Sequence, residues 1–311
     1  MNPLKKQEKK MLNRFIFFLI LSFSFVLTSL SEAQNKQLKI YISVDMEGVA
    51  GVVTGDQLGP AGFEYQRFRK FMTDETLAAV KAARRAGATE ILISDSHGNG
   101  ENLLVEEFPD FVRIIRSWPR KLGMMEGIDQ TFAAAIFIGY HAPTTSLRGT
   151  RAHTFSSAKL TRVALNGKAV SEAVWNAALA GHFGVPVVMI SGDDALYEDI
   201  RPVLGHVEFA ETQKTISFHS ANCLTPAASC RLIEQKVTAA FNRLSDFKPF
   251  ILKTPVTLEV SFKHYRPVEL LSYLRTVQRI DSHTISFTGE DMTEISEFLE
   301  FITGYSADIE P

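Results

Sequence analysis

The stretch Lys39-Ile-Tyr-Ile-Ser-Val-Asp45-Met-Glu47-Gly48 is a short apolar run that ends on acidic side chains. Its Ile, Val and aromatic content, bounded by polar residues, predicts a buried strand of a parallel sheet rather than a helix. Two later stretches repeat the pattern, Ile91-Leu-Ile-Ser-Asp95-Ser-His97 and Ile136-Phe-Ile-Gly-Tyr-His141. In open α/β folds ligands bind at the carboxyl edge of the sheet. We therefore expect the three polar tails to meet at that edge.

The spacing within each tail supports this placement. Side chains two positions apart on a strand point the same way. Asp45 and Glu47 have this spacing, and so do Asp95 and His97.

The order of the other segments predicts an α/β fold. Helical spacing over residues 63–71 and 73–86 links the first two strands in a crossover unit, and such units build parallel sheets. A helix over residues 170–183 leads to a fourth strand that ends on Asp193 and Asp194. These acids either cap the next helix or receive a substrate ammonium group. Later segments are predicted as helices over 227–244, 267–275 and 292–303 and strands over 256–262 and 284–288.

We expect a mainly parallel sheet with flanking helices, followed by a smaller C-terminal α+β lobe. The corresponding division is a metal-binding α/β core over residues 34–215 and the smaller lobe over residues 216–311. A chain of this length can bury a large core in one big domain or two.

The first 33 residues differ from the rest. Basic residues between Lys5 and Arg14 precede an uncharged apolar stretch from Phe15 to Leu30, and small residues follow at Ser31-Glu32-Ala33. This pattern is typical of an export signal, because the apolar stretch is shorter than a membrane span of about 20 residues. We expect a mature protein from about Gln34, periplasmic or extracellular, without stable membrane association. An uncleaved amino-terminal anchor is the alternative.

Charge and cysteine content exclude some classes of partner. Without residues 1–33 the chain has 28 basic and 33 acidic residues, so it has little attraction to nucleic acid or anionic lipid. Cys223 and Cys230 are the only cysteines, and their spacing gives no four-ligand structural zinc site. The sequence leaves open whether they pair.

The polar tails predict a metal site. Asp45, Glu47, His97 and His141 offer the mixture of oxygen and nitrogen ligands that suits zinc and related divalent metals. One catalytic zinc takes three protein ligands, so four such residues indicate two metals, with a carboxylate such as Asp45 as the bridge. Taken singly, each acid could cap a helix or form a turn, and each histidine could be an ordinary polar residue.

Four motifs in this order resemble the bacterial zinc-dependent D-aminopeptidases. They are Ser43-Val-Asp-Met-Glu-Gly48, Asp95-Ser-His97, Gly139-Tyr-His-Ala142 and Asn166-Gly-Lys-Ala-Val-Ser-Glu172, and the resemblance spans residues 38–303. The Val-Asp-Met-Glu-Gly string is distinctive, whereas Asp-Ser-His alone is a weak signal.

The resemblance implies roles for particular residues. It places a two-zinc site on Asp45, Glu47, His97, His141 and Glu172. Glu172 stands in the first turn of the helix over 170–183, where a carboxylate is also favoured by the helix dipole alone. His153 matches the family's catalytic histidine; imidazole titrates near neutral pH and can carry a proton. We further expect Asp95 to orient His97 or another ligand, as carboxylates often do for metal-bound histidines, or else to cap a turn.

The resemblance also implies hydrolysis of short peptides with an amino-terminal D-residue such as D-Ala, by a ring-like homo-oligomer. Two other classes remain open. One is a different two-metal hydrolase such as a phosphoesterase, because the ligands do not choose carbon over phosphorus. The other is a non-enzymatic exported binding protein, which would not need five convergent metal ligands.

Overall fold

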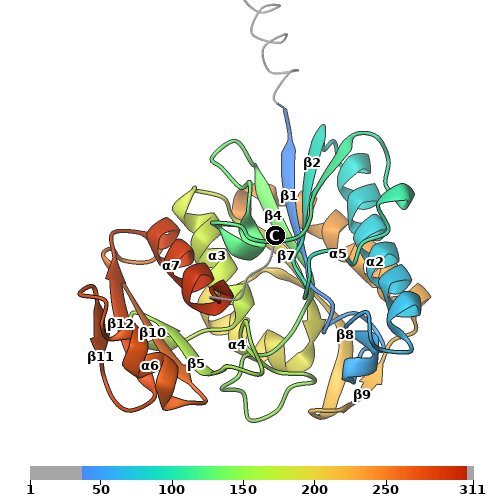
Figure 1. The fold of residues 1–311 in the computed structure, drawn as a ribbon. Helices are drawn as coiled ribbons and strands as arrows, with labels where there is room; N and C mark the ends of the chain where they lie inside the picture. The colour runs from blue at the N-terminus through green and yellow to red at the C-terminus, as the bar shows by residue number, and fades with distance from the viewer. Residues whose placement is uncertain (1–36, 307–311) are drawn as a thin grey trace, which may run out of the picture. The chain divides into compact units, whose positions relative to one another are not determined.

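The computed structural model describes residues 37–306 and contains two sheets with helices against them (Figure 1). The predicted leader, residues 1–33, lies outside the described residues. Across residues 37–306, no helix has both the length and the apolar character required to cross a bilayer.

The larger sheet, sheet A, has the strand order β3-β2-β1-β4-β7-β8-β9. The first six strands in this order are parallel, and β9 pairs antiparallel with β8. Its strands are β1 (Lys39–Val44), β2 (Glu90–Asp95), β3 (Val112–Ile115), β4 (Ala134–Tyr140), β7 (Val187–Asp193), β8 (Glu208–Ser217) and β9 (Ser220–Cys223).

The smaller sheet, sheet B, is antiparallel, with the order β11-β12-β10-β5-β6. Its strands are β5 (Leu160–Leu165), β6 (Lys168–Ala169), β10 (Val256–Phe262), β11 (Val277–Arg279) and β12 (Thr284–Gly289). Burial alternates residue by residue along β10, whereas every residue of β4 and β7 is buried. Sheet B therefore has one buried face, and the centre of sheet A is covered on both faces.

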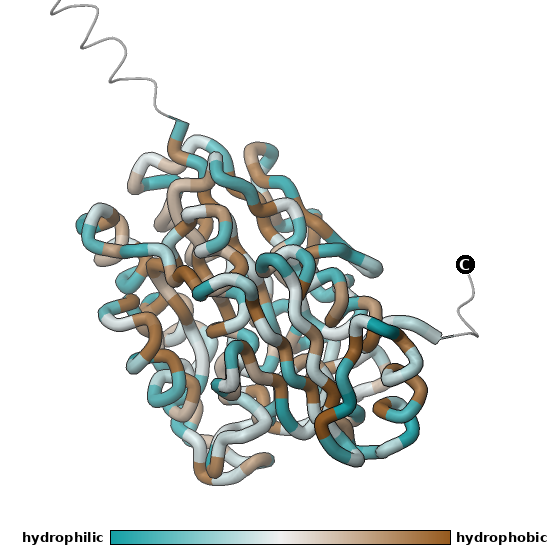
Figure 2. Tube along the Cα trace, turned by 90° about the vertical axis from the view of Figure 1, so that its left-hand side faces the viewer, coloured by the Kyte–Doolittle hydropathy of each residue, from teal (hydrophilic) through white to brown (hydrophobic). Residues whose placement is uncertain are grey.

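Six α-helices accompany the sheets in the described part of the chain. Helix α2 packs against α5, and α3 packs against α4 and α7 (Figure 1). They are α2 (Tyr65–Arg85), α3 (Glu172–His182), α4 (Asp194–Leu204), α5 (Pro226–Phe241), α6 (Tyr265–Leu271) and α7 (Met292–Gly304). Short 3₁₀ turns are η1 (Gly55–Gln57), η2 (Val105–Glu107), η3 (Gly123–Met125) and η4 (Leu244–Asp246). Figure 2 shows apolar and polar segments alternating along the chain, as expected where each element buries one side.

The predicted α/β class with a mainly parallel sheet is confirmed. The two helical segments predicted over 63–71 and 73–86 form one continuous helix, α2, because no residue between them breaks it. The β5–β6 hairpin was not predicted, and it pairs with β10 from the C-terminal part. Sheet B thus takes strands from both sides of residue 215, while the domain division at that residue stays a prediction.

The strand order reverses between β1 and β4, since the chain adds β2 and β3 on one side of β1 and β4, β7 and β8 on the other. Such a reversal leaves a crevice at the carboxyl ends of the two strands, where ligands bind in open α/β sheets. Asp45 follows β1 and His141 follows β4, so the polar tails lie at this position.

Candidate metal centre

The turn after β1 lies directly against the end of β4. Asp45 N–H donates to Ile138 O at 2.8 Å, and Gly48 N–H donates to Gly139 O at 2.7 Å. A Cβ atom on Gly48 would lie only 2.0 Å from Tyr140 O, so no other residue fits there without a shift of the backbone. This close approach fixes where the Asp45 and Glu47 side chains begin.

Two side chains of strand β8 also form hydrogen bonds to the turn after β1. Thr212 Oγ1 donates to Gly48 O at 2.6 Å, and Gln213 Nε2 donates to Glu47 O at 3.1 Å. These two residues were not predicted, because a side chain that holds backbone leaves no motif in the sequence.

Five predicted ligands converge at this edge and are all buried: Asp45, Glu47, His97, His141 and Glu172. His97 Nδ1 lies 3.2 Å from Asp45 Oδ1 and 2.9 Å from Glu47 Oε2. His141 Nε2 lies 3.3 Å from Asp45 Oδ2 and 3.5 Å from Glu172 Oε2.

Asp45 belongs to two groups of possible metal ligands. One consists of Asp45, Glu47 and His97 and the other of Asp45, His141 and Glu172, and within each group the ligand atoms lie within 4.8 Å of one another. The two Asp45 oxygens face different groups. Asp45 is therefore shared between the two groups.

In three histidines, the ring nitrogen that points away from the carboxylates (the outer nitrogen) faces a backbone carbonyl, and the other (the inner nitrogen) faces the carboxylates. His97 Nε2 lies 2.7 Å from Leu58 O, His141 Nδ1 3.0 Å from Ala142 O, and His153 Nδ1 2.9 Å from Arg151 O. Because a carbonyl oxygen only accepts, each of these nitrogens carries the hydrogen, and the inner nitrogen of the neutral ring has a free lone pair. Lone pairs of imidazole nitrogens and carboxylate oxygens then face each other across short distances. A cation bound between them would remove their mutual repulsion.

Among residues 37–306, three buried atoms of the centre have no hydrogen-bond partner: Asp45 Oδ2, Glu47 Oε2 and His141 Nε2. Buried polar atoms are normally paired, so these three indicate a missing partner. Their oxygen and nitrogen types suit a divalent metal such as zinc. The residues present therefore fit a metal ion.

The charges of the centre are strongly coupled. Burial raises the pKa of the Asp45 carboxyl, and repulsion from Glu47 raises it further. Burial has the same effect on Glu47, but attraction to His97 outweighs it and holds the pKa of Glu47 well below its usual range. Burial disfavours the His141 imidazolium, yet attraction to Glu172 and Asp45 raises its pKa well above the usual value. The carboxylates thus favour positive charge, whether proton or metal, at the imidazole nitrogens.

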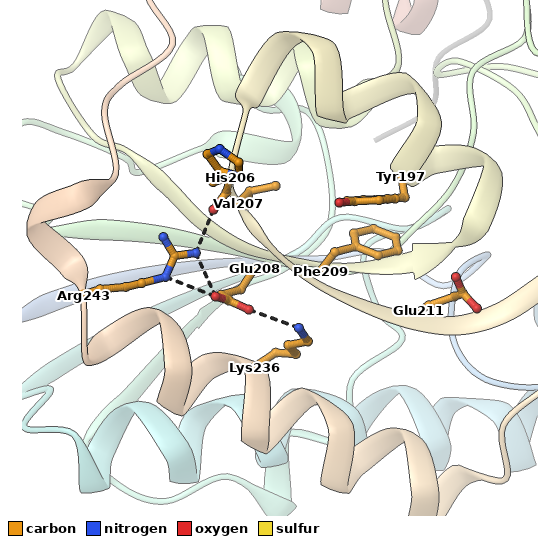
Figure 3. A pocket seen from close by; sticks show the side chains of 8 residues that line it. All are labelled: Tyr197, His206, Val207, Glu208, Phe209, Glu211, Lys236 and Arg243. Atoms are coloured by element: carbon orange, nitrogen blue, oxygen red, sulfur yellow. Dashed lines mark hydrogen bonds and ion pairs between the residues drawn. The ribbon is translucent and has the colours of Figure 1, made fainter.

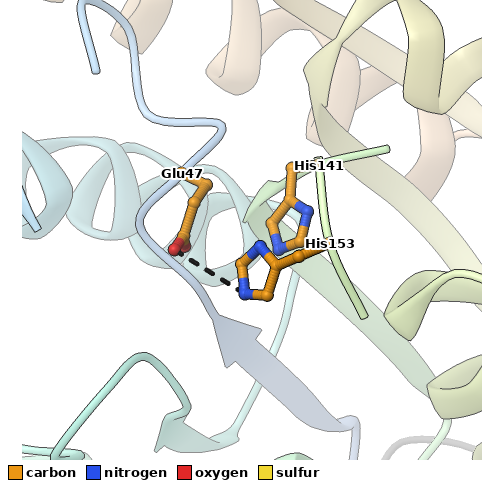
Figure 4. A group of neighbouring side chains, drawn as sticks. All are labelled: Glu47, His141 and His153. Carbon is orange, nitrogen blue, oxygen red and sulfur yellow. Dashed lines mark ion pairs between the residues drawn. The ribbon is translucent and has the colours of Figure 1, made fainter. Parts of the chain in front are cut away.

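His153 lies at the open side of the centre, stacked on His141 with ring centroids 4.2 Å apart (Figure 4). Its Nε2 is 4.0 Å from Glu47 Oε1 and 3.9 Å from Glu172 Oε1. Its side chain is 16% exposed, against 1% for His141 and 8% for His97. His153 therefore combines contact with the carboxylates and access from outside.

Asp95 acts on the chain after His97 rather than on the imidazole ring. Its carboxylate accepts the N–H groups of Asn102 at 2.6 Å and Leu103 at 2.7 Å, and Asn102 Nδ2 at 2.8 Å. Asn102 Nδ2 also donates to His97 O at 2.6 Å. Within the described residues the ring itself is held by Leu58 O, a backbone atom that no motif predicts.

Asp193 and Asp194 support the loop that carries His153. Asp193 caps α4 through Leu196 N–H at 2.8 Å, the predicted capping role, and also accepts Thr150 N–H at 3.0 Å. Asp194 accepts Arg148 Nη1 at 2.7 Å. Both carboxylates are therefore engaged by the protein's own groups.

A separate hollow of about 390 Å³ lies over β8 and α5 and contains none of the predicted ligands (Figure 3). Its central carboxylate, Glu208, is paired with Lys236 at 3.1 Å and Arg243 at 2.7 Å. Both thiols, Cys223 and Cys230, are free in the structure. These features stand apart from the metal centre.

The fold and the site together define a class. A buried set of histidines and carboxylates at the reversal point of a parallel α/β sheet, with one acid shared between two groups of possible ligands and an accessible imidazole, is the constellation of a metal-dependent hydrolase.

The chain belongs to the D-aminopeptidase family, peptidase family M55, whose model matches residues 38–301. A D-aminopeptidase of Bacillus subtilis (strain 168) is 31% identical over 267 residues, which cover 86% of this chain and 97% of the relative. A solved structure from Bacillus subtilis, described as a zinc-dependent D-aminopeptidase and a self-compartmentalizing protease, matches with a TM-score of 0.83 and 30% identity. That match covers 88% of this chain and 100% of the other. The family predicted from the motifs is confirmed.

Proposed function

We propose that this chain is a zinc metallopeptidase that removes the amino-terminal residue of short D-Ala-containing peptides at a two-metal site. The observation that carries the proposal is the shared Asp45, whose two oxygens face two separate groups of histidine and carboxylate atoms. The preference for D-residues is supported by the family and its relatives.

Asp45, Glu47, His97, His141 and Glu172 would hold the metal ions. Bound zinc acts as a Lewis acid that polarises the scissile carbonyl and makes water a stronger acid. The residues that hold it are already oriented, because the backbone carbonyls of Leu58 and Ala142 fix two of the rings and Phe155 N–H binds Glu172 Oε1 at 2.6 Å.

His153 would carry the proton. Hydrolysis takes a proton from the attacking water and delivers one to the leaving amine when the C–N bond breaks. His153 Nε2 lies 4.0 Å from Glu47 Oε1 and 3.9 Å from Glu172 Oε1, and its 16% exposure would let water and a peptide end approach it. Because Nδ1–H donates to Arg151 O, Nε2 is the ring nitrogen that would take up and release the proton.

Two further parts of the proposal concern location and assembly. Residues 1–33 would direct export, which would place the enzyme beside peptidoglycan fragments that contain D-amino acids. A homo-oligomer that encloses its active sites is supported by the relative described as self-compartmentalizing. N-terminal sequencing of the fractionated protein tests the first part, and the mass of the purified protein in solution tests the second.

The first test measures bound metals in the purified protein by elemental analysis and hydrolysis of paired D-Ala and L-Ala p-nitroanilides. We expect close to two zinc ions per chain and D-selective turnover, both lost in His97→Ala. Zinc with hydrolysis of p-nitrophenyl phosphate but not of the anilides would indicate a phosphoesterase. Metal-free protein without turnover after zinc addition would leave a binding protein as the better account.

A further inference from the structure

A set of buried polar side chains adjoins the metal centre in the chain without contributing ligands. Ser43 stands two residues before Asp45, Ser96 directly before His97, and Tyr140 directly before His141. Asn176 lies one helical turn after Glu172 on α3. Each ligand-bearing element therefore supplies a member of the set.

These side chains are hydrogen-bonded to one another. Tyr140 Oη donates to Ser43 Oγ at 2.7 Å and accepts from Asn176 Nδ2 at 2.8 Å. Ser43 Oγ and Ser96 Oγ lie 2.9 Å apart. The contacts run without interruption from β2 through β1 and β4 to α3.

The network continues beyond Ser96 to an arginine. Ser96 Oγ donates to Ser94 Oγ at 2.9 Å, and Arg120 Nη1 donates to Ser94 Oγ at 2.9 Å. Arg120 Nη2 donates to Asp95 O at 2.9 Å, so the guanidinium also holds the backbone at the end of β2. The whole set, called the hydroxyl network below, consists of Ser43, Ser94, Ser96, Arg120, Tyr140 and Asn176.

The network is deeply buried, with relative exposures of 0% for Ser43 and Tyr140, 1% for Asn176 and 6% for Ser96. Burying polar groups is unfavourable unless every one is paired, and apolar side chains of the same size could fill the space. Polar groups at this place therefore need a reason other than packing. A role in holding the ligands would be such a reason, because Ser43, Ser96, Tyr140 and Asn176 each lie within four residues of one of four predicted ligands along the chain.

Backbone pairing explains why the link to α3 matters. The strands β1, β2 and β4, which Asp45, His97 and His141 follow, are joined by backbone hydrogen bonds, whereas the helix α3 takes no part in the strand pairing described for residues 37–306. Asn176 to Tyr140 is a direct polar bond between the helix with Glu172 and the strand with His141. This bond can fix the position of α3 along and about its own axis, and therefore the position of Glu172 relative to the other ligands.

We propose that the hydroxyl network is a positioning device for the metal centre and that the Tyr140–Asn176 bond fixes α3, and with it Glu172, relative to His141, in addition to the bond from Phe155 N–H to Glu172 Oε1. The inference rests on the proposed metal site. Ser43, Tyr140 and Asn176 are at most 1% exposed, so they would act through the ligands near them rather than on a substrate.

The test compares zinc affinity, from competition with a chelator, with the free energy of unfolding of the zinc-free protein. Tyr140→Phe removes one hydroxyl and leaves Asn176 Nδ2 without that acceptor. We expect zinc affinity to fall on the order of tenfold, as for other residues that orient metal ligands. Ser43→Ala, a smaller change in the same network, is expected to act in the same direction and serves if Tyr140→Phe fails to fold.

A double variant separates positioning from stability. Tyr140→Phe with Asn176→Leu removes both partners, so stability is expected to recover toward wild type because no buried donor is left unpaired. Zinc affinity is expected to stay low, since the link from α3 to β4 is still missing. Thr76→Val is the control: Thr76 is fully buried, but among the described residues its hydroxyl bonds only Met72 O within α2, so zinc affinity should not change.

The results separate the inference from the proposed function. If Tyr140→Phe and Ser43→Ala bind zinc as tightly as wild type, or if affinity recovers with stability in the double variant, the network has only a structural role. If wild type itself binds no zinc, the proposed function fails instead.

Discussion

Replacing Glu75 by glutamine is expected to make the protein less sensitive to alkaline pH. Glu75 lies within α2, and its Oε1 accepts Ala50 N–H at 3.0 Å, from the chain beyond the β1 turn, and the Ser229 hydroxyl at 2.7 Å, from α5. Burial raises the pKa of its carboxyl from 4.5 to about 7, with a smaller contribution from Asp74. The side chain is 1% exposed, so solvent screening is slight.

The direction of the effect follows from the two pKa values. Below pH 4.5 Glu75 is protonated in both folded and unfolded chains and has no effect on the pH dependence of stability. Between pH 4.5 and about 7 the unfolded chain loses the proton first, so the free energy of unfolding falls as pH rises. A shift of this size corresponds to about 3 kcal/mol, lost by pH 8.

Urea unfolding of the zinc-free protein at pH 5 and pH 8 measures the effect. Glu75→Gln keeps an acceptor for Ala50 and Ser229 and cannot ionise, so its stability relative to wild type should rise by about 2.5 kcal/mol between these two pH values, since wild type has already lost a little under 1 kcal/mol at pH 5. Glu101→Gln, a change at an exposed carboxylate, is the control and should follow wild type. Parallel curves for Glu75→Gln and wild type would refute the reasoning.

Three other changes test the centre itself. His153→Ala should lower kcat by about 10²–10⁴ while bound zinc stays constant, as expected for a proton carrier; loss of zinc in this variant would make His153 a ligand instead. Gly48→Ala should destabilise the protein by about 1–3 kcal/mol or more in urea unfolding, because its Cβ would overlap Tyr140 O, whereas Gly55→Ala, with no atom within 4 Å, should not. Removing zinc with a chelator should lower the melting temperature, because zinc at 1,000 times its Kd contributes about 4 kcal/mol; an unchanged melting temperature would contradict a metal site in the folded state.

The strand ends could be predicted from sequence because each signal is local. The apolar runs before Asp45, His97 and His141 predict buried strands, and parallel strands bring their carboxyl ends together. Glu172 carries no such signal: in the first turn of α3, after the capping Ser171, it is equally explained as a helix start. It was identified only through the resemblance to a known family.

Long-range pairing limited the prediction of sheet B. Strand β5 includes Thr161 and Arg162, and its partner β10 lies almost one hundred residues later, so neither segment alone indicates the hairpin's sheet. The anchor of His97 was unpredictable for another reason: Leu58 acts through its carbonyl oxygen, which every residue has.

The placement of Glu172 has a consequence for how the chain can be divided. It follows the β5–β6 hairpin of sheet B by three residues, and its Oε1 binds Phe155 N–H, five residues before β5. Both approaches to this ligand are thus tied to β10, which carries no ligand. A protein shortened before Val256 would retain all five predicted ligands but lose β10, and with it the strand pairing that supports the position of Glu172. The residues before Val256 are therefore not expected to form the metal centre on their own.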